Sequence, residues 1–173
     1  MSKLTLKKEL QNLDAQQLTE IILDCYSARK EFSAYFEFFL NPDVKKLSDK
    51  YYEKLKKEIL RAKRRGYCSA RISHVKKMLK EFDSFNPGAV HVIDLMFEAL
   101  HLFAIAERNY YFTEALANST AKLAQSIMEY ADKHHEFTHA IDLMNRFLSN
   151  SQISLHLRKR INSAIEDILS TNR

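Results

Sequence analysis

The amino-acid sequence predicts an all-α fold of about seven to eight helices. Only 2 of the 173 residues are glycine and 2 are proline, which is too few for a sheet with tight turns. Apolar residues recur instead at helical spacings of three and four along most of the chain. We therefore expect a single domain over residues 1–173, in which successive helices form antiparallel pairs with short links. The pairs form either an irregular helical repeat of the HEAT or TPR kind or a bundle.

One strongly apolar helix, predicted over residues 87–107, is the centre of this arrangement. Asn86 and Pro87 are typical of a helix start. Apolar side chains cover well over half of the helix circumference, whereas a surface helix needs a stripe of only about 100°. We therefore expect other helices to bury it. Its single polar edge interrupts the apolar run and argues against a membrane span, and it consists of His91, Asp94, Glu98 and His101.

The first 40 residues contain three helical segments. Leucines predict a short amphipathic helix over residues 3–11. Asp14 and Gln17 form a capping-box pattern for the next helix, which breaks near Ser27–Lys30. Residues 32–40 are so rich in aromatic side chains that they must pack either inside the fold or against a partner.

Two basic helices follow, over residues 44–65 and 69–82, each with one apolar face. Gly66 fits the C-terminal end of the first, and Ser69 fits the N-cap of the second. After the central helix the sequence predicts three more, over residues 113–131 (N-cap Thr113), 137–148 and 151–168 (N-cap Ser151).

Charge is unevenly distributed along the chain. The net charge is +5, but residues 45–80 carry +11 and residues 81–145 carry −7. A basic segment of this kind favours an acidic partner, and its candidate anion- or nucleic-acid-binding residues are Lys57, Arg61, Arg64, Arg65, Lys76, Lys77 and Lys80. The alternative is a solvated surface that balances the acidic part of the same chain.

Arg71 falls on the apolar side of its predicted helix. A charged side chain there needs a partner, so we expect a buried pair with Asp94 or Glu98 of the central helix. These three residues are predicted to be structural, with an anion-binding Arg71 as the minority alternative.

Residues 135–139, His-Glu-Phe-Thr-His, match the H-E-x-x-H signature of zinc proteases. On one helix, His135 and His139 share a metal and Glu136 acts as base. Residues 132–136 instead resemble a link between helices, which separates the ligands. The sequence also contains two E-x-x-H pieces, Glu98–His101 and Glu136–His139. Two such matches are unremarkable by chance, so they give little support to a di-iron site. We predict neither a metal nor another cofactor.

Residues 1–10 lack the continuous apolar core of a secretory signal. Cys25 and Cys68 have no metal-ligand spacing and fit reduced thiols. Together these features predict a cytoplasmic protein.

Residues 64–98 resemble a bacterial all-helical family of unknown function. The matching features are Arg65-Gly66, Ala70-Arg71, Ser73, Lys76-Lys77, Phe82, Pro87 and Asp94-Leu95-Met96. The resemblance spans roughly the first 145 residues and weakens over residues 149–173, where the family pattern is richer in glycine and aromatics. It implies an all-helical cytosolic protein with no assigned activity, and it transfers no catalytic residues.

These observations favour a non-catalytic helical binding or adaptor domain for a protein partner, with no membrane partner. Exposure of residues 32–40 is the feature expected of such an interface. The alternative is polyanion or nucleic-acid binding through residues 56–80. The third alternative is a metal-dependent enzyme that uses His135, Glu136 and His139.

Overall fold

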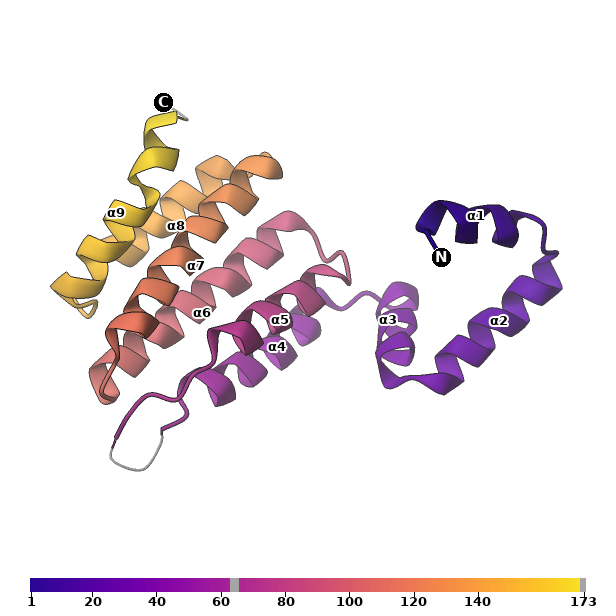
Figure 1. Cartoon of the computed structure of the whole chain (residues 1–173), viewed down its shortest axis with the longest axis horizontal. Coiled ribbons are helices and arrows are strands. Elements are labelled where there is room, and N and C mark those ends of the chain that lie inside the picture. Colours follow the sequence, from indigo (N-terminus) through magenta and orange to yellow (C-terminus); the bar gives the residue numbers. More distant parts are fainter. Residues whose placement is uncertain (63–65, 172–173) are drawn as a thin grey trace. The chain divides into compact units, whose positions relative to one another are not determined.

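The computed structural model describes residues 1–62 and 66–171, with the side chains of 167 and 171 left out, and it confirms the all-α fold (Figure 1). The described helices are α1 (Lys3–Gln11), α2 (Ala15–Ala28), α3 (Lys30–Leu40), α4 (Val44–Ile59), α5 (Ile72–Asp83), α6 (Ala89–Asn109), α7 (Glu114–Lys133), α8 (Phe137–Ser149) and α9 (Leu155–Thr171). These are nine helices within the described residues, against the seven to eight predicted. The short first helix is present, and the break near Ser27–Lys30 separates α2 from α3.

The chain divides into two compact units, Met1–Asp43 and Val44–Arg173. The first contains α1 to α3 and the second contains α4 to α9. A single domain over residues 1–173 stays a prediction, as does a HEAT- or TPR-like repeat.

The first unit has well-formed helix ends but no core. The Asp14 side chain accepts from the Gln17 N–H at 2.8 Å, and the Gln17 side chain accepts from the Asp14 N–H at 3.1 Å, which confirms the predicted capping box. The Ser33 hydroxyl donates to the Tyr26 carbonyl and ties α3 to α2. No side chain is buried in residues 1–43, all of which the structure describes.

The second unit is built around α6, as predicted. Helices α4, α5, α7 and α8 all contact it, and α9 packs against α7. Figure 1 shows α6, α7 and α9 side by side. Leu100 and Phe103 of α6 are completely buried, and a buried side chain of this size contributes about 1.5–3 kcal/mol to folding.

Helix α6 starts two residues later than predicted. Asn86 and Gly88 both have positive φ angles, of 55° and 105°, so the chain turns there and the helix begins at Ala89. Gly88, rather than Asn86, occupies the N-cap position. The helix has the length and hydropathy of a membrane span, but 61% of that window is buried inside the protein. A core helix has the same pattern, and the cytoplasmic location stays a prediction.

The predicted ends of the two basic helices are wrong. Helix α4 ends at Ile59 instead of residue 65, and α5 begins at Ile72 instead of following an N-cap at Ser69. Backbone pairs between Ala62 and Cys68 and between Tyr67 and Tyr111 occupy the connection. These backbone hydrogen bonds replace the helical ones, so the chain doubles back before α5 starts.

Hydroxyl side chains cap the N-termini of two later helices, α7 and α9. The Thr113 hydroxyl accepts from the Leu116 N–H, which confirms the predicted N-cap of α7. For α9 the predicted cap, Ser151, is wrong. Ser154 takes this role, and its hydroxyl accepts from the Leu157 N–H at 3.0 Å.

Candidate functional surfaces

The first candidate surface is the apolar face of α2 and α3 in the first unit. Phe39 is 67% exposed, and Phe32 and Tyr35 are 45% and 40% exposed. Tyr35 stacks on Phe39 with 6.5 Å between the ring centroids, so the aromatic rings form one continuous surface. In α2, Ile22 and Leu23 are 45% and 58% exposed. Residues 32–40 are therefore partly exposed, as a protein interface requires, while Phe36 and Phe38 are half-buried.

The second candidate surface is a groove between α4 and α5 with a volume of about 530 Å³. Its lining is rich in basic side chains and consists of Lys54, Lys57, Glu58, Arg61, His74, Lys77, Met78 and Glu81. Three of the predicted anion-binding residues therefore meet here: Lys57, Arg61 and Lys77. Lys76 and Lys80 line a separate cavity of about 200 Å³ between α5, α6 and α7. Arg64 and Arg65 lie outside the described residues.

The carboxylates of this α4–α5 groove are already engaged by cations. Glu58 Oε1 lies 3.1 Å from Arg71 Nε and 3.9 Å from His74 Nδ1. Burial acts to raise the pKa of Glu58, but the hydrogen bonds from Arg71 and the nearby positive charges outweigh it and leave the pKa below its ordinary value. Glu81 lies 3.9 Å from Lys77. Lys57 forms no ion pair with any residue that the structure describes, so its charge remains available.

Arg71 pairs with a carboxylate, as predicted, but its predicted burial and its predicted partners are wrong. Arg71 is the N-cap of α5, its side chain is 51% exposed, and its partner is Glu58 of α4. The helical wheel misplaced it because Arg71 precedes Ile72, the first residue of α5, and therefore has no position on the helix. Glu98 is also exposed and Asp94 is half-buried, so neither matches the expected buried pair with Arg71.

The polar edge of α6 is divided between two environments. His91, Asp94 and Glu98 line a cavity of about 560 Å³ between α4 and α6, together with Lys45 and Asp49. His101 instead packs edge-on against the Phe147 ring.

Asp94 has a partner that sequence reasoning missed. Its Oδ1 lies 2.8 Å from Nε2 of His139 on α8. Such a pair can orient an imidazole for proton transfer, but His139 has no second hydrogen-bond partner within the part of the chain that the structure describes. In the sequence, this pair is indicated only by the fact that Asp94 and His139 each lie on the polar face of their own helix.

The H-E-x-x-H motif does not lie on one helix. His135 has a φ of 61° and belongs to the turn before α8, which begins at Phe137. His139 is one turn into α8 and is hydrogen-bonded to Asp94. Among the residues that the structure describes, no group of three or more His, Cys, Asp or Glu side chains is placed to hold a metal ion. The geometry therefore gives the metalloprotease alternative no support.

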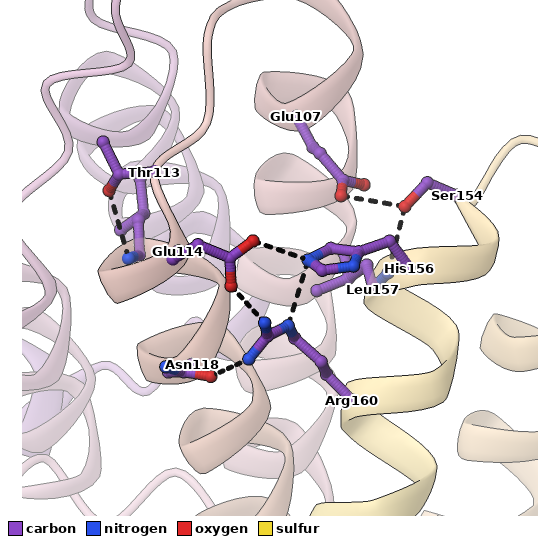
Figure 2. Close-up of polar contacts among 9 residues, drawn as sticks. Glu107, Thr113, Glu114, Asn118, Ser154, His156, Leu157 and Arg160 are labelled. Carbon is purple, nitrogen blue, oxygen red and sulfur yellow. Dashed lines mark hydrogen bonds and ion pairs between the residues drawn. The ribbon is translucent and has the colours of Figure 1, made fainter.

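A polar network that the sequence did not predict joins α7 to α9 (Figure 2). The Arg160 guanidinium donates to Glu114 and Asn118 of α7, and its Nε donates to His156 Nε2 at 3.0 Å. Since His156 Nε2 accepts this hydrogen bond, it carries no proton for Glu114, although the two atoms of that pair lie only 3.3 Å apart. The network is exposed and joins two helices, so its role is structural.

Both cysteines are free thiols, as predicted, and both are half-buried. Burial raises the pKa of Cys68, which keeps its sulfur protonated and a weak nucleophile.

The fold and these surfaces describe an all-α protein. Residues 1–167 match a family of unknown function, DUF6155, and the chain belongs to this family. The match confirms the expected membership of a family of unknown function and extends beyond the first 145 residues. Comparisons with curated proteins and with solved structures find no match.

Proposed function

We propose that this protein is a non-catalytic helical binding domain and that residues 1–43 bind another protein. The observation that supports this is the absence of any buried side chain in these fully described residues, together with their many exposed apolar side chains. A helical segment of about 40 residues is rarely stable without additional contacts. Each large apolar side chain that a partner covers adds about 1.5–3 kcal/mol.

The geometry of α3 supports a helical ligand. Phe32, Tyr35 and Phe39 are separated by three and four positions, so they lie along one face of the helix. An apolar face of this kind binds an amphipathic helix through side chains at the same spacing.

The charge around this face specifies the partner further. Residues 14–43 contain six acidic and two basic side chains, a net charge of −4. A partner helix whose apolar stripe is flanked by Lys or Arg is therefore complementary to the surface. We conclude that the occupant is a basic amphipathic helix of another protein.

The test uses the full chain and a fluorescent amphipathic Leu/Lys peptide of about 20 residues, with a Leu/Glu peptide of the same pattern for comparison. Fluorescence anisotropy gives the dissociation constants. We expect binding of the basic peptide only, and a loss of at least about tenfold in F39E because it replaces the most exposed aromatic ring of the apolar face by a charge. The matched control is L155E on α9, where a leucine of similar exposure (63%) is changed in the second unit.

Three outcomes overturn the proposal. The first is equal binding of the peptide by wild type, F39E and L155E. The second is a concentration-dependent dimer in sedimentation equilibrium that F39E abolishes, because the occupant is then a second copy of this chain. The third is strong hydrogen-exchange protection of residues 32–40 in the monomer, since α3 is then stable without a partner.

A further inference from the structure

The α4–α5 groove has an excess of positive charge at one end. Glu58 and Glu81 are engaged by Arg71 and Lys77, while Lys57 has no acidic partner among the described residues. Arg61 Nε donates to Ser69 Oγ at 3.3 Å, which positions the guanidinium without neutralising it. Two positive charges without carboxylate partners, one of them positioned by a hydrogen bond, are suited to phosphate groups.

A pair of exposed aromatic rings belongs to the same region. Tyr67 and Tyr111 are 42% and 62% exposed, with 4.6 Å between their ring centroids. Their backbones are fixed by two hydrogen bonds, from the Cys68 N–H to the Tyr111 carbonyl at 3.0 Å and from the Tyr111 N–H to the Gly66 carbonyl at 2.8 Å. The structure therefore holds two large, exposed rings on a hydrogen-bonded backbone.

Backbone pairing places this ring pair next to the basic groove. Ala62 pairs with Cys68, and the Ser69 N–H and hydroxyl both donate to the Arg61 carbonyl, at 2.9 and 2.8 Å. Arg61 lines the groove, and Tyr67 immediately precedes Cys68. The charges and the rings are thus neighbours along one tied connection between α4 and α5.

We infer that the α4–α5 groove and the Tyr67–Tyr111 pair together bind single-stranded nucleic acid. Lys57 and Arg61 contact the phosphates, and the tyrosine rings stack on bases. A positively charged groove beside exposed aromatic rings is the general arrangement for single-strand binding. A duplex fits less well, because its bases stack on each other and do not present their faces to the protein. This inference is independent of the protein-binding face on α2 and α3.

The test measures anisotropy of fluorescein-labelled oligo(dT) and oligo(U), each about 20 nucleotides long, with the full chain at several salt concentrations. A DNA duplex of equal length is the comparison. We expect tighter binding of a single strand than of the duplex, with log K falling linearly with log salt by roughly 0.7 for each phosphate contacted. A preference for either strand supports the proposal.

Substitutions separate the two kinds of contact. Lys57→Ala is expected to weaken binding and to reduce the salt slope, whereas Lys159→Ala on α9 is the matched control and leaves both unchanged. Replacing both Tyr67 and Tyr111 by Ala is expected to weaken binding roughly tenfold with the salt slope unchanged. Replacing both by Phe keeps the stacking surface and therefore the affinity. Tyr26→Ala, which removes an exposed tyrosine of the first unit, is the control for the loss of an aromatic ring.

No binding at low salt overturns the inference. Equal binding of the duplex, together with full affinity in the double Ala variant, also overturns it, because only non-specific attraction to a basic surface then remains. Circular dichroism checks whether the double Ala variant is folded. If it is not, the folded double Phe variant provides the test, and a loss of affinity in that variant contradicts stacking.

Discussion

Arg71 donates two hydrogen bonds to one oxygen of Glu58, from its backbone N–H and from its side-chain Nε, both at 3.1 Å. Glu58 lies in the last turn of α4, and Arg71 is the N-cap of α5. The pair therefore closes the connection that holds Arg61 and Tyr67. The Glu58 side chain is only 11% exposed, so its charge has exchanged most of its water for these contacts.

The first prediction concerns Glu58→Gln. Because its pKa is lowered from 4.5 in the folded protein, ionised Glu58 stabilises the fold fully above that value, and this contribution is lost as the pH falls through the lowered folded pKa. The variant should lose about 1–2 kcal/mol at pH 7 and show a weaker acid dependence. Urea unfolding between pH 7 and 3 measures both effects. Glu53→Gln, which changes a more exposed ion pair with Lys56, is the control and should change stability by less than about 1 kcal/mol.

The second prediction concerns the contact between Tyr130 of α7 and Asp83 of α5. The Tyr130 hydroxyl donates to Asp83 Oδ1 at 2.7 Å. Burial and this hydrogen bond raise the pKa of Tyr130 above its ordinary value of 10.0. The contribution to stability is therefore complete below pH 10 and is lost as the pH rises further.

Tyr130→Phe should cost about 1 kcal/mol at pH 7 and should flatten the alkaline loss of stability. Thermal unfolding between pH 7 and 11 measures this, with Tyr26→Phe in the first unit as the control. An unchanged alkaline limb in Tyr130→Phe would contradict the assignment.

Local sequence predicts those features that local chemistry determines. Asp14 and Thr113 cap their helices as predicted because an N-cap needs only the next three residues. The buried α6 follows from its own apolar circumference. The end of α4 cannot be predicted from local sequence in this way. The connection that follows it is held by Tyr67, which pairs with Tyr111 at a distance of 44 positions in the sequence. A distant strand-like pair has no local signature.

The same distinction applies to the candidate sites. Lys57, Arg61 and Lys77 meet in one groove because α4 and α5 are adjacent in sequence and in space. The pairing of Asp94 with His139 depends on how α8 packs on α6, so sequence alone could not find it. Arg71 was misplaced because the predicted N-cap, Ser69, lies two residues before the observed one, so the helical wheel included a residue that precedes the helix.

The third prediction tests the central position of α6 with two substitutions in that helix. Leu100 is completely buried, whereas Ile105 is 40% exposed. Leu100→Ala should cost about 2–5 kcal/mol because it leaves a cavity, and Ile105→Ala should cost less than about 1 kcal/mol. Chemical denaturation of both variants measures the difference. Similar losses in the two would mean that α6 is not buried on the Leu100 side.

The last prediction concerns the geometry of Arg160, which joins α9 to α7 (Figure 2). Its planar guanidinium donates to Glu114, Asn118 and His156 from three different nitrogens. A lysine keeps the charge but cannot reach all three acceptors at once. Arg160→Lys should therefore lose nearly as much stability as Arg160→Ala, about 0.5–1 kcal/mol, since the network is exposed. A double-mutant cycle with Glu114→Gln isolates the pairwise part, and Lys159→Ala is the control on the same helix. Full stability of Arg160→Lys would show that charge alone, rather than the fork of donors, joins the two helices.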